Sequence, residues 1–508
     1  MITDTVRPPA TQKAKYMTLL AALLGWMFDG FEMGLFPLIG GPALKDLLGS
    51  SATKADADMW FGAIIAVFLV GAATGGVLFG WLGDKIGRVR AMSLSIFTYA
   101  IFTGLCGFAR EAWHIAVLRF IASLGMGGEW SLGVALVNEI WPGKNRAFIA
   151  GLIGAAANVG FLMVALLSMG LAGFIGGVEG MLKAICCSDA TTTKLLANSA
   201  WRFLMISGAF PALLIFFIRL FVPESEKWED EKAKGGTSHW GNADLVGVLI
   251  GCGAALAIIW AWSPAASLSA AVATLVTVVG LVVALFGFLH PVRQYLGRAI
   301  AAGLIKSESQ KKVVTSMLLG AGLASVALLG TWGSIQWAPR WAAQLQPDTA
   351  EVKYYAKEKT QIATAVGAIV GTIAAAMAAG RFGRRITYSV MCVGSIASAL
   401  WFYNANTTFG TGFLVAAFLA GGITASFYGF FPLYFPELFP TSVRATGQGF
   451  SFNFGRIVAA IGGLQTATLM KAFDGSFPKA GSIMAAIYVI GIFIIWLGPE
   501  TKDQELPE

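Results

Sequence analysis

Fourteen long apolar runs limit this chain to folds in which helices cross a lipid bilayer. Each run has about the 20 residues that a spanning helix needs, and the 508-residue chain is 56% hydrophobic but only 13% charged. Ordinary soluble domains carry about 25% charged residues. We therefore predict an all-α polytopic membrane protein, because helices satisfy their own backbone polar groups in lipid. The runs lie near residues 16–39, 59–82, 91–109, 112–138, 147–173, 202–222, 244–262, 266–289, 313–338, 361–380, 386–404, 409–434, 445–470 and 481–498.

The basic residues gather in alternate loops between these runs and account for the net charge of +8. Loops rich in Lys and Arg stay in the cytoplasm, so we predict a multi-pass protein of the cell membrane with both termini cytoplasmic. A nucleic-acid partner is not needed to explain this charge. The five cysteines show no metal-ligand spacing, and we expect neither a metal nor a cofactor. Cys186 and Cys187 are adjacent in a predicted outside loop, where a disulfide between neighbours would be strained.

The runs divide into sets of six, two and six. Residues 1–222 hold the first six-helix bundle, and residues 313–508 hold the second bundle with a short polar tail. Residues 223–312 hold a charged linker and two extra spans. An even number of spans keeps both bundles in the same orientation, as the charge pattern requires. We predict two related six-helix bundles with two extra central helices, about 14 spans in all.

One loop pattern occurs in both halves of the chain. Residues 80–90 read GWLGDKIGRVR between the second and third runs, and residues 380–385 read GRFGRR at the corresponding place. Glycine permits a tight turn and a close helix approach, whereas charged side chains hold the loop at the membrane surface. The repetition indicates a duplicated domain.

The first loop resembles the signature of the major facilitator superfamily, G-x-L-x-D-x-x-G-R. Gly80, Leu82, Asp84, Gly87 and Arg88 match the signature, and the second copy lacks the Asp. The resemblance implies the major facilitator fold, in which two bundles alternate in opening a shared site to either side of the membrane. It also implies a protein that works as a monomer.

A second charged pattern, Glu-x-x-Pro-x-x-x-Arg, occurs after the fourth run and again in the second bundle. It matches the same pattern in sugar porters, which favours ion pairs that hold the two bundles together on the cytoplasmic side. The alternative is a set of ordinary charges at the membrane interface. The predicted cytoplasmic gate consists of Asp84, Arg88, Glu139, Arg146, Arg384, Glu437 and Arg444.

A narrower resemblance rests on residues 125–130, GMGGEW, which follow Arg119. This stretch is similar to the sialate:proton symporter family, which also includes lactate and pyruvate carriers. Some members of that family have two additional central helices. A further echo of the superfamily is the sequence PES at residues 223–225 and PET at residues 499–501. The resemblance implies a small organic acid as substrate.

Two carboxylates lie deep in the first run. Asp29 and Glu32 are about 20–24 Å into it and share one helix face. In proton-coupled relatives a carboxylate follows a Gly-aromatic pair, as Glu32 does here, and pairs with an Arg that corresponds to Arg119. The resemblance thus implies a proton-coupling pair, Glu32–Arg119; the alternative is a permanent structural bridge. Asp29 is a second candidate proton carrier, and Glu129 is either a third or a structural acceptor.

Arg456 lies about 18 Å along the run near 445–470, counted from Arg444. No acid lies within one turn of it in the sequence, and a guanidinium presents a rigid fork that suits a carboxylate. We predict that Arg456 anchors an anionic substrate; the alternative is a snorkelling or interhelix-paired Arg. The other predicted substrate-binding residues are Arg119, Asn453, Asn158, Gln336 and Tyr428.

These features predict a secondary transporter that imports a small organic acid with protons by alternating access. Its partners would be the organic anion, protons and the lipid bilayer. No P-loop motif of the form G-x-x-x-x-G-K-[ST] is present, which argues against direct ATP drive. The alternatives are sugar or polyol uptake, drug:proton antiport and a membrane sensor that does not transport. No nucleophile–base arrangement points to an enzyme.

Overall fold

The computed structural model describes residues 11–49, 52–141, 143, 145–185, 188–263, 266–346 and 355–508. Within these ranges the regular structure is helical and strands are absent. Twelve helical segments of the described chain are long and apolar enough to cross a membrane. The predicted all-α polytopic fold is confirmed. Cys186 and Cys187 lie outside the described residues.

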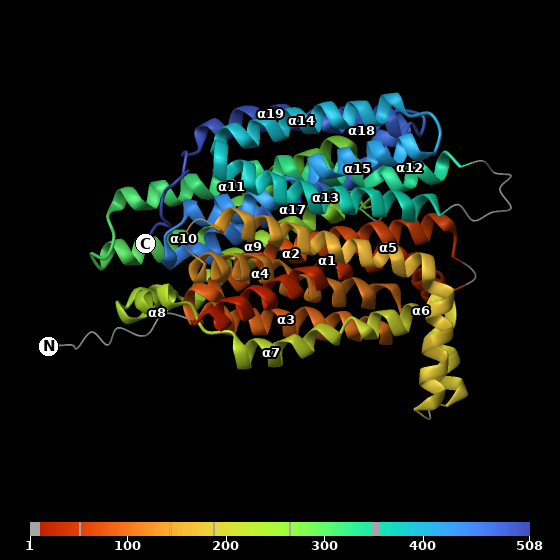
Figure 1. Ribbon diagram of the computed structural model, residues 1–508, viewed down its shortest axis with the longest axis horizontal. Helices are drawn as coiled ribbons and strands as arrows, with labels where there is room; N and C mark the ends of the chain where they lie inside the picture. Colours follow the sequence, from red (N-terminus) through yellow and green to blue (C-terminus); the bar gives the residue numbers. More distant parts are fainter. Residues whose placement is uncertain are drawn as a thin grey trace.

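Six of the predicted runs form the helices of the first half (Figure 1). The sixth run is broken: Pro211, which lacks a backbone donor, lies in a 3-10 turn at Phe210–Leu213 between two helices. The sixth helix starts before the predicted run, and the chain turns at residues 198–200, where φ is positive. The helices are α1 (Gln12–Leu48), α2 (Lys54–Ile86), α3 (Arg88–Leu105), α4 (Ala112–Ile140), α5 (Arg146–Ala184), α6 (Asp189–Ser207) and α7 (Leu214–Phe221).

The second half repeats this arrangement, with its helices beside those of the first half in Figure 1. Its fifth span is the single helix α17 (Arg444–Ala472), which has 29 residues and carries Arg456. The remaining helices are α11 (Ser307–Gly333), α12 (Ala338–Gln344), α13 (Ala356–Phe382), α14 (Arg384–Ala405), α15 (Thr411–Ala425), α16 (Phe427–Tyr434), α18 (Phe477–Ala485) and α19 (Ile487–Ile494).

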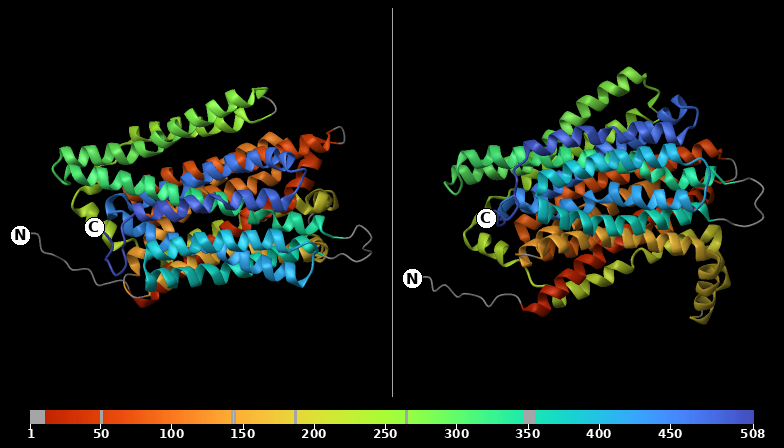
Figure 2. Two further views of the ribbon diagram at one scale, coloured as in Figure 1. Left: turned by 90° about the horizontal axis from the view of Figure 1, so that it is seen from above. Right: turned by 45° about the horizontal axis from the view of Figure 1, so that its top comes forward.

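An insertion separates the two halves. It contains the short helix α8 (Glu226–Ala233) and the long helices α9 (Leu245–Ala261) and α10 (Ala270–Ala301), which pack on each other as a hairpin. The hairpin appears in green at one side of the bundle in Figure 2. Helix α9 packs against α2 and α17, and α10 packs against α11. The two extra central helices therefore contact both halves.

Glycines allow the closest approaches between the halves, where α2 packs against α17 and α5 against α13. A Cβ atom added to Gly449 would lie 2.2 Å from the carbonyl oxygen of Gly76. A Cβ atom on Gly151 would lie 2.7 Å from the Cα of Ile373. Small residues at such crossings let backbones approach each other in lipid, where packing drives helix association.

The GMGGEW stretch is explained by the contact between α4 and α2. A Cβ atom on Gly127 would lie 1.9 Å from the backbone oxygen of Ala72, so no larger residue fits there without moving a helix. This close packing places Glu129, two residues further on, in the interior of the first half, where it is fully buried.

Replacing Gly127 with Ala should lower the free energy of unfolding by about 1–3 kcal/mol, the usual cost of overpacking a tight contact. Gly62→Ala on α2 is the matched control, because a Cβ atom there meets nothing within 4 Å. Since Ala favours the helix by about 0.5–1 kcal/mol over Gly, the control should be neutral or slightly stabilising. Thermal unfolding of the purified protein in detergent measures both changes, and equal effects would contradict the packing argument.

Candidate functional site

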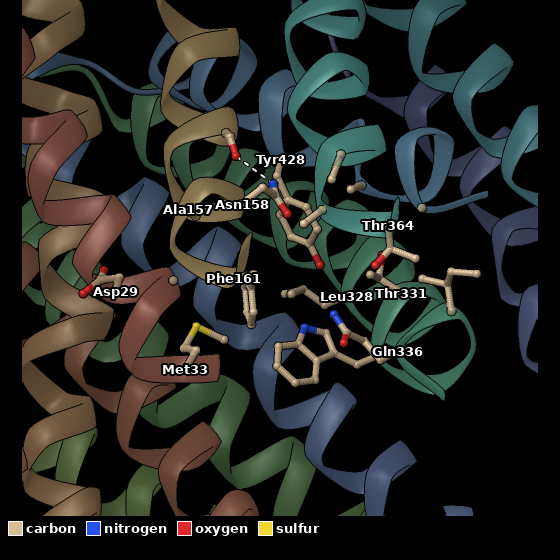
Figure 3. Close-up of a pocket in the computed structure, with 18 of the residues that line it drawn as sticks. Asp29, Met33, Ala157, Asn158, Phe161, Leu328, Thr331, Gln336, Thr364 and Tyr428 are labelled. Carbon is tan, nitrogen blue, oxygen red and sulfur yellow. Dashed lines mark hydrogen bonds between the residues drawn. The ribbon is translucent and has the colours of Figure 1, made fainter. Parts of the chain in front are cut away.

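A cavity lies between the two halves (Figure 3). Its volume is about 130 Å³. In the close-up, Asp29 and Met33 of α1 lie on one side, and Thr331 and Gln336 of the second half lie on the other. Further walls come from α4, α5, α13, α15, α16 and α17. Both halves therefore build this space.

The lining combines aromatic rings with a few polar groups. Six aromatic side chains take part: Trp26, Trp130, Phe161, Trp332, Tyr428 and Phe452. The uncharged polar side chains are Asn158, Thr331, Gln336, Gln361 and Thr364. Among the described lining residues, the charged ones are Asp29 and Arg456, one from each half.

Four of the predicted substrate-binding residues line this cavity: Arg456, Asn158, Gln336 and Tyr428. The guanidinium of Arg456 lies 5.4 Å from the ring centroid of Phe452. Its Nη1 atom is buried without a hydrogen-bond partner in the described chain, whereas the hydroxyl of Tyr428 interacts with Thr331 and Trp332. Asn158 donates to the carbonyl oxygen of Gly154 at 2.9 Å, which leaves its own oxygen for another donor.

The other two predicted binding residues, Arg119 and Asn453, are not among the lining residues. Asn453 donates to the carbonyl oxygens of Gly127 and Gly449 at 3.1 and 3.0 Å, so it joins α17 to α4 instead of facing the cavity. Arg119 is only 3% exposed. Its side chain lies on the face of α4 that packs against α1 and α2. Sequence position gives depth along a helix, but not the neighbouring helix that a side chain meets.

Arg119 pairs with Glu32, as the resemblance implied. Its Nη1 donates to Oε1 of Glu32 at 2.7 Å, and both side chains are buried. The guanidinium lies 4.6 Å from the ring of Phe36 and 4.5 Å from that of Phe68. Thr103 reaches the same carboxylate oxygen at 3.5 Å. The pair is thus enclosed by aromatic rings, away from the cavity lining.

Asp29 and Glu129 form a second acidic group. A Cβ atom on Gly25 would lie 1.7 Å from Oε1 of Glu129, so the absence of a side chain at Gly25 makes room for this carboxyl. The two carboxyls interact with each other, and neither Glu129 nor Oδ1 of Asp29 has a further hydrogen-bond partner in the described chain. Asp29 interacts electrostatically with Glu129, Glu32 and Arg456. Glu129 itself does not line the cavity.

At one end of the bundle, Glu139 binds arginines from both halves. Its Oε1 accepts from Arg88 at 3.2 Å and from Arg444 of the second half at 2.7 Å. Its Oε2 accepts from the hydroxyl of Ser225. These arginine and glutamate side chains are at most 1% exposed.

Glu437 repeats this arrangement with the halves exchanged. It accepts from Arg384 of its own half at 2.6 and 3.0 Å, from Arg146 of the first half, and from the hydroxyl of Thr501. The predicted gate residues other than Asp84 therefore meet in two related groups, one around Glu139 and one around Glu437. We call these two groups and Asp84 the charged end. Each glutamate binds one arginine from each half.

Residues 17–244 and 308–508 match the family described as sugar (and other) transporter. This chain belongs to that family, within the major facilitator superfamily. The residues between the two matched segments include all of helices α9 and α10.

Some relatives of this transporter are similar to it over nearly their whole length. A Haemophilus influenzae protein named for metabolite transport is 26% identical over 495 residues, which cover 97% of this chain and 98% of the relative. The niacin transporter NiaP of Acinetobacter baylyi is 23% identical over 509 residues, covering 97% and 96%. The solved structure of the proton:xylose symporter XylE superimposes with a TM-score of 0.65 at 17% identity, covering 98% of both chains. That likeness shows the major facilitator fold.

Asp84 makes the charged end of the transporter asymmetric. Its carboxylate pairs with Arg88 at 2.7 Å and accepts from the backbone N–H groups of Ala445 and Thr446 at 3.2 and 2.8 Å. It thus caps the N-terminus of α17, in the other half, where a negative charge is favourable. At the related position in the second half, Gly380 lies against Ala147 of α5 and offers no carboxylate.

The repeated PES and PET sequences cap the helices that follow the signature loops. Glu224 accepts from the backbone N–H groups of Arg88 and Val89 at the start of α3. Glu500 accepts in the same way from Arg384 and Arg385 at the start of α14. Burial raises the pKa of Glu224. Burial also acts to raise the pKa of the more exposed Glu500, but the backbone donors outweigh it and the net pKa is lowered.

Sequence reasoning did not single out several polar residues near the acids or in the cavity. The Tyr99 hydroxyl of α3 interacts electrostatically with Glu129, Asp29 and Glu32, and it has no hydrogen-bond partner among the described residues. Thr331, Gln361 and Thr364 line the cavity. In the sequence, these residues stand out only as polar side chains within apolar runs. Because Thr and Tyr are common in such runs, their presence there is weak evidence for a functional site.

The two arginines that cross between the halves should differ in their contribution to stability. Arg444 is fully buried and also donates to the backbone oxygens of Phe439 and Pro507, whereas the Arg146 side chain is 13% exposed. Arg444→Gln should therefore lower the free energy of unfolding by about 3 kcal/mol, and Arg146→Gln by less. Thermal unfolding in detergent gives the order, and a larger loss for Arg146→Gln would contradict it.

Proposed function

We propose that this transporter carries a small organic acid of the sialate or monocarboxylate class together with protons, by alternating access. The single observation that carries the proposal is the buried Arg456 on the cavity wall, whose Nη1 atom lacks a partner in the described chain. A desolvated guanidinium without a close counter-ion is costly. A substrate carboxylate would supply that counter-ion in a fork-to-fork arrangement.

The name of one relative points to the same class of substrate. NiaP is named as a transporter of niacin, a small carboxylic acid. The aromatic walls of the cavity would cover a flat or partly apolar body, and its amides would bind further polar groups. Sugar or polyol uptake is the second candidate, because the fold is that of a xylose symporter and the lining includes Asn158, Gln336 and Gln361.

Proton coupling would reside among Glu32, Asp29, Arg119 and Glu129. Three of them are carboxyl groups deep in the first half, and such groups in spanning helices are typically functional. Arg119 would act through its ion pair with Glu32. The proton gradient would then drive the organic anion inward against its own gradient.

The charged end would be the cytoplasmic gate, closed in this conformation. Its two glutamates each join arginines of both halves, so opening this end would require these pairs to separate. The positive-inside rule would place this end, and both termini, on the cytoplasmic side of the cell membrane. We expect one chain to be the working unit, because residues from both of its halves line the cavity.

Uptake into liposomes with an imposed inward proton gradient tests the proposal. We expect accumulation of at least one acid from a panel of radiolabelled nicotinate, lactate, pyruvate and sialic acid, but not of xylose. Proton-driven uptake of xylose and of no acid would favour the sugar alternative. Absence of proton-driven uptake of every compound would contradict symport.

Arg456→Gln should raise the half-saturation concentration for the transported acid by about 10- to 100-fold, the effect of losing a charge-assisted hydrogen bond. Arg456→Lys should recover only part of this loss, because an ammonium cannot form the bidentate contact. Arg110→Gln is the matched control, because Arg110 is exposed and outside the cavity. An unchanged half-saturation concentration in Arg456→Gln would rule out the anchor.

A further inference from the structure

We propose that the end of α5 and the start of α6 form a hairpin that lies along the surface of the lipid bilayer, with one apolar face inserted among the acyl chains. We call residues 171–185 and 188–197 the lateral hairpin. The inference requires only that the bundle spans a membrane, so it holds for any substrate and any mode of coupling. With the charged end in the cytoplasm, as proposed above, the hairpin would lie in the outer leaflet.

Helix α5 is longer than a membrane span. It has 39 residues, which extend about 58 Å at 1.5 Å per residue, whereas the hydrocarbon core of a bilayer is about 30 Å thick. Figure 1 shows the end of α5 and the start of α6, in yellow, projecting sideways from the bundle at the end opposite α8 and the C-terminus. The right-hand view of Figure 2 shows the same projection. Because the spans cross the bilayer, a hairpin that lies across their direction runs along its surface.

The base of the lateral hairpin is held by Asp46 of α1. The Asp46 carboxylate accepts from Asn198 at 2.9 Å, from the indole of Trp201 at 3.1 Å and from Arg202 at 3.0 Å. The chain turns here through three positive φ angles, at residues 198–200, none of which is a glycine. Such a conformation is costly and persists where the surroundings hold it in place. The direction of the hairpin is therefore set by specific contacts.

One face of the lateral hairpin is apolar and exposed. Phe174, Met181 and Ile185 are 37%, 49% and 64% exposed. Their spacing of seven and then four residues places them on one face of α5, and we call these three residues the apolar stripe. The adjoining face carries Val178 and Leu182, which are buried. The packing of the hairpin within the chain thus leaves the apolar stripe uncovered.

The opposite face of the same helix is polar or small. Lys183 pairs with Glu179 at 2.6 Å, and about half of each side chain is exposed. Lys183 lies two residues after Met181, on the other side of the helix at about 100° per residue. Gly176 and Gly180 lie on this side too, and an added Cβ atom there would meet nothing within 4 Å in the described chain. A helix that is apolar on one face and charged on the other suits the boundary between water and lipid.

The apolar stripe joins a surface that already faces lipid. The ring of Phe174 lies 6.3 Å from the ring of Phe203, on the part of α6 that belongs to the sixth span. Further along this span, Phe210, Leu213 and Leu220 are exposed, and large apolar side chains on the outside of a spanning segment contact acyl chains. The apolar surface is thus continuous from the span to the hairpin. Lipid is the occupant that covers both, and a protein partner would have to displace it.

Spin-label accessibility in liposomes tests the proposal. Met181→Cys and Lys183→Cys are the matched pair, made in a background in which the five native cysteines are replaced by serine. A water-soluble nickel complex is present on both sides of the vesicles. Oxygen should reach the label at position 181 in preference to nickel, at a depth of about 5–10 Å into the boundary between headgroups and acyl chains. At position 183 the preference should be reversed.

Two results of this experiment would overturn the inference. Preferential access of nickel to both positions would place the lateral hairpin in water. Exclusion of both reagents from position 181 would show that protein, such as a second copy of the chain, covers the apolar stripe.

A photoreactive lipid provides a second test on the unmodified chain. Phosphatidylcholine with a diazirine in its acyl chain should form adducts within residues 171–185, as it should with the exposed residues Phe210 and Leu213 of the sixth span. Helix α8, which is rich in charged residues, is the control and should stay unlabelled. Mass spectrometry locates the adducts. Labelling of residues 210–213 without any labelling of residues 171–185 would contradict the proposal.

Discussion

Charges inside a lipid-embedded bundle must be compensated locally, because an isolated ion there costs several kcal/mol. The charged end meets this requirement almost completely. Three carboxylates, those of Asp84, Glu139 and Glu437, share four arginines, and backbone oxygens accept many of the remaining donors. Arg88, for example, also donates to the carbonyl oxygens of Gly83 and Thr441. The two halves are thus joined by groups that have few alternative partners.

The cavity is the opposite case within the same molecule. Around it, the Nη1 atom of Arg456 lacks a hydrogen-bond partner among the described residues, and the carboxyls of Asp29 and Glu129 interact with each other without a salt bridge in the described chain. Unsatisfied polar groups are expensive in a low-dielectric interior, and they are kept where a ligand or a proton completes them. The contrast between a saturated end and an unsaturated centre is the physical reason for proposing substrate binding at Arg456 and conformational control at Glu139 and Glu437.

Much of this architecture could be predicted from sequence. The apolar runs predicted the helices, because length and hydropathy are properties of single segments. The repeated loops predicted the residues of the charged end and ion pairs among them that join the two halves, but not which arginines bind Glu139 and which bind Glu437. Arg119 and Asn453 were expected at the substrate site, yet they face other helices. The packing of distant segments determines which neighbour each face of a helix contacts. This packing cannot be read from a single sequence.

The insertion adds a constraint that the sequence motifs do not reveal. Trp228 of α8 donates to the backbone oxygen of Asp84, and Lys85 bonds to Asn242 just before α9. These contacts attach the insertion to the first half, while α9 and α10 also pack on α17 and α11 of the second. The hairpin therefore lies across the line along which the halves would separate at the charged end. If the halves separate at this end, as proposed, the contacts of the insertion with one half would have to break, so the insertion would stabilise the closed conformation in addition to the ion pairs.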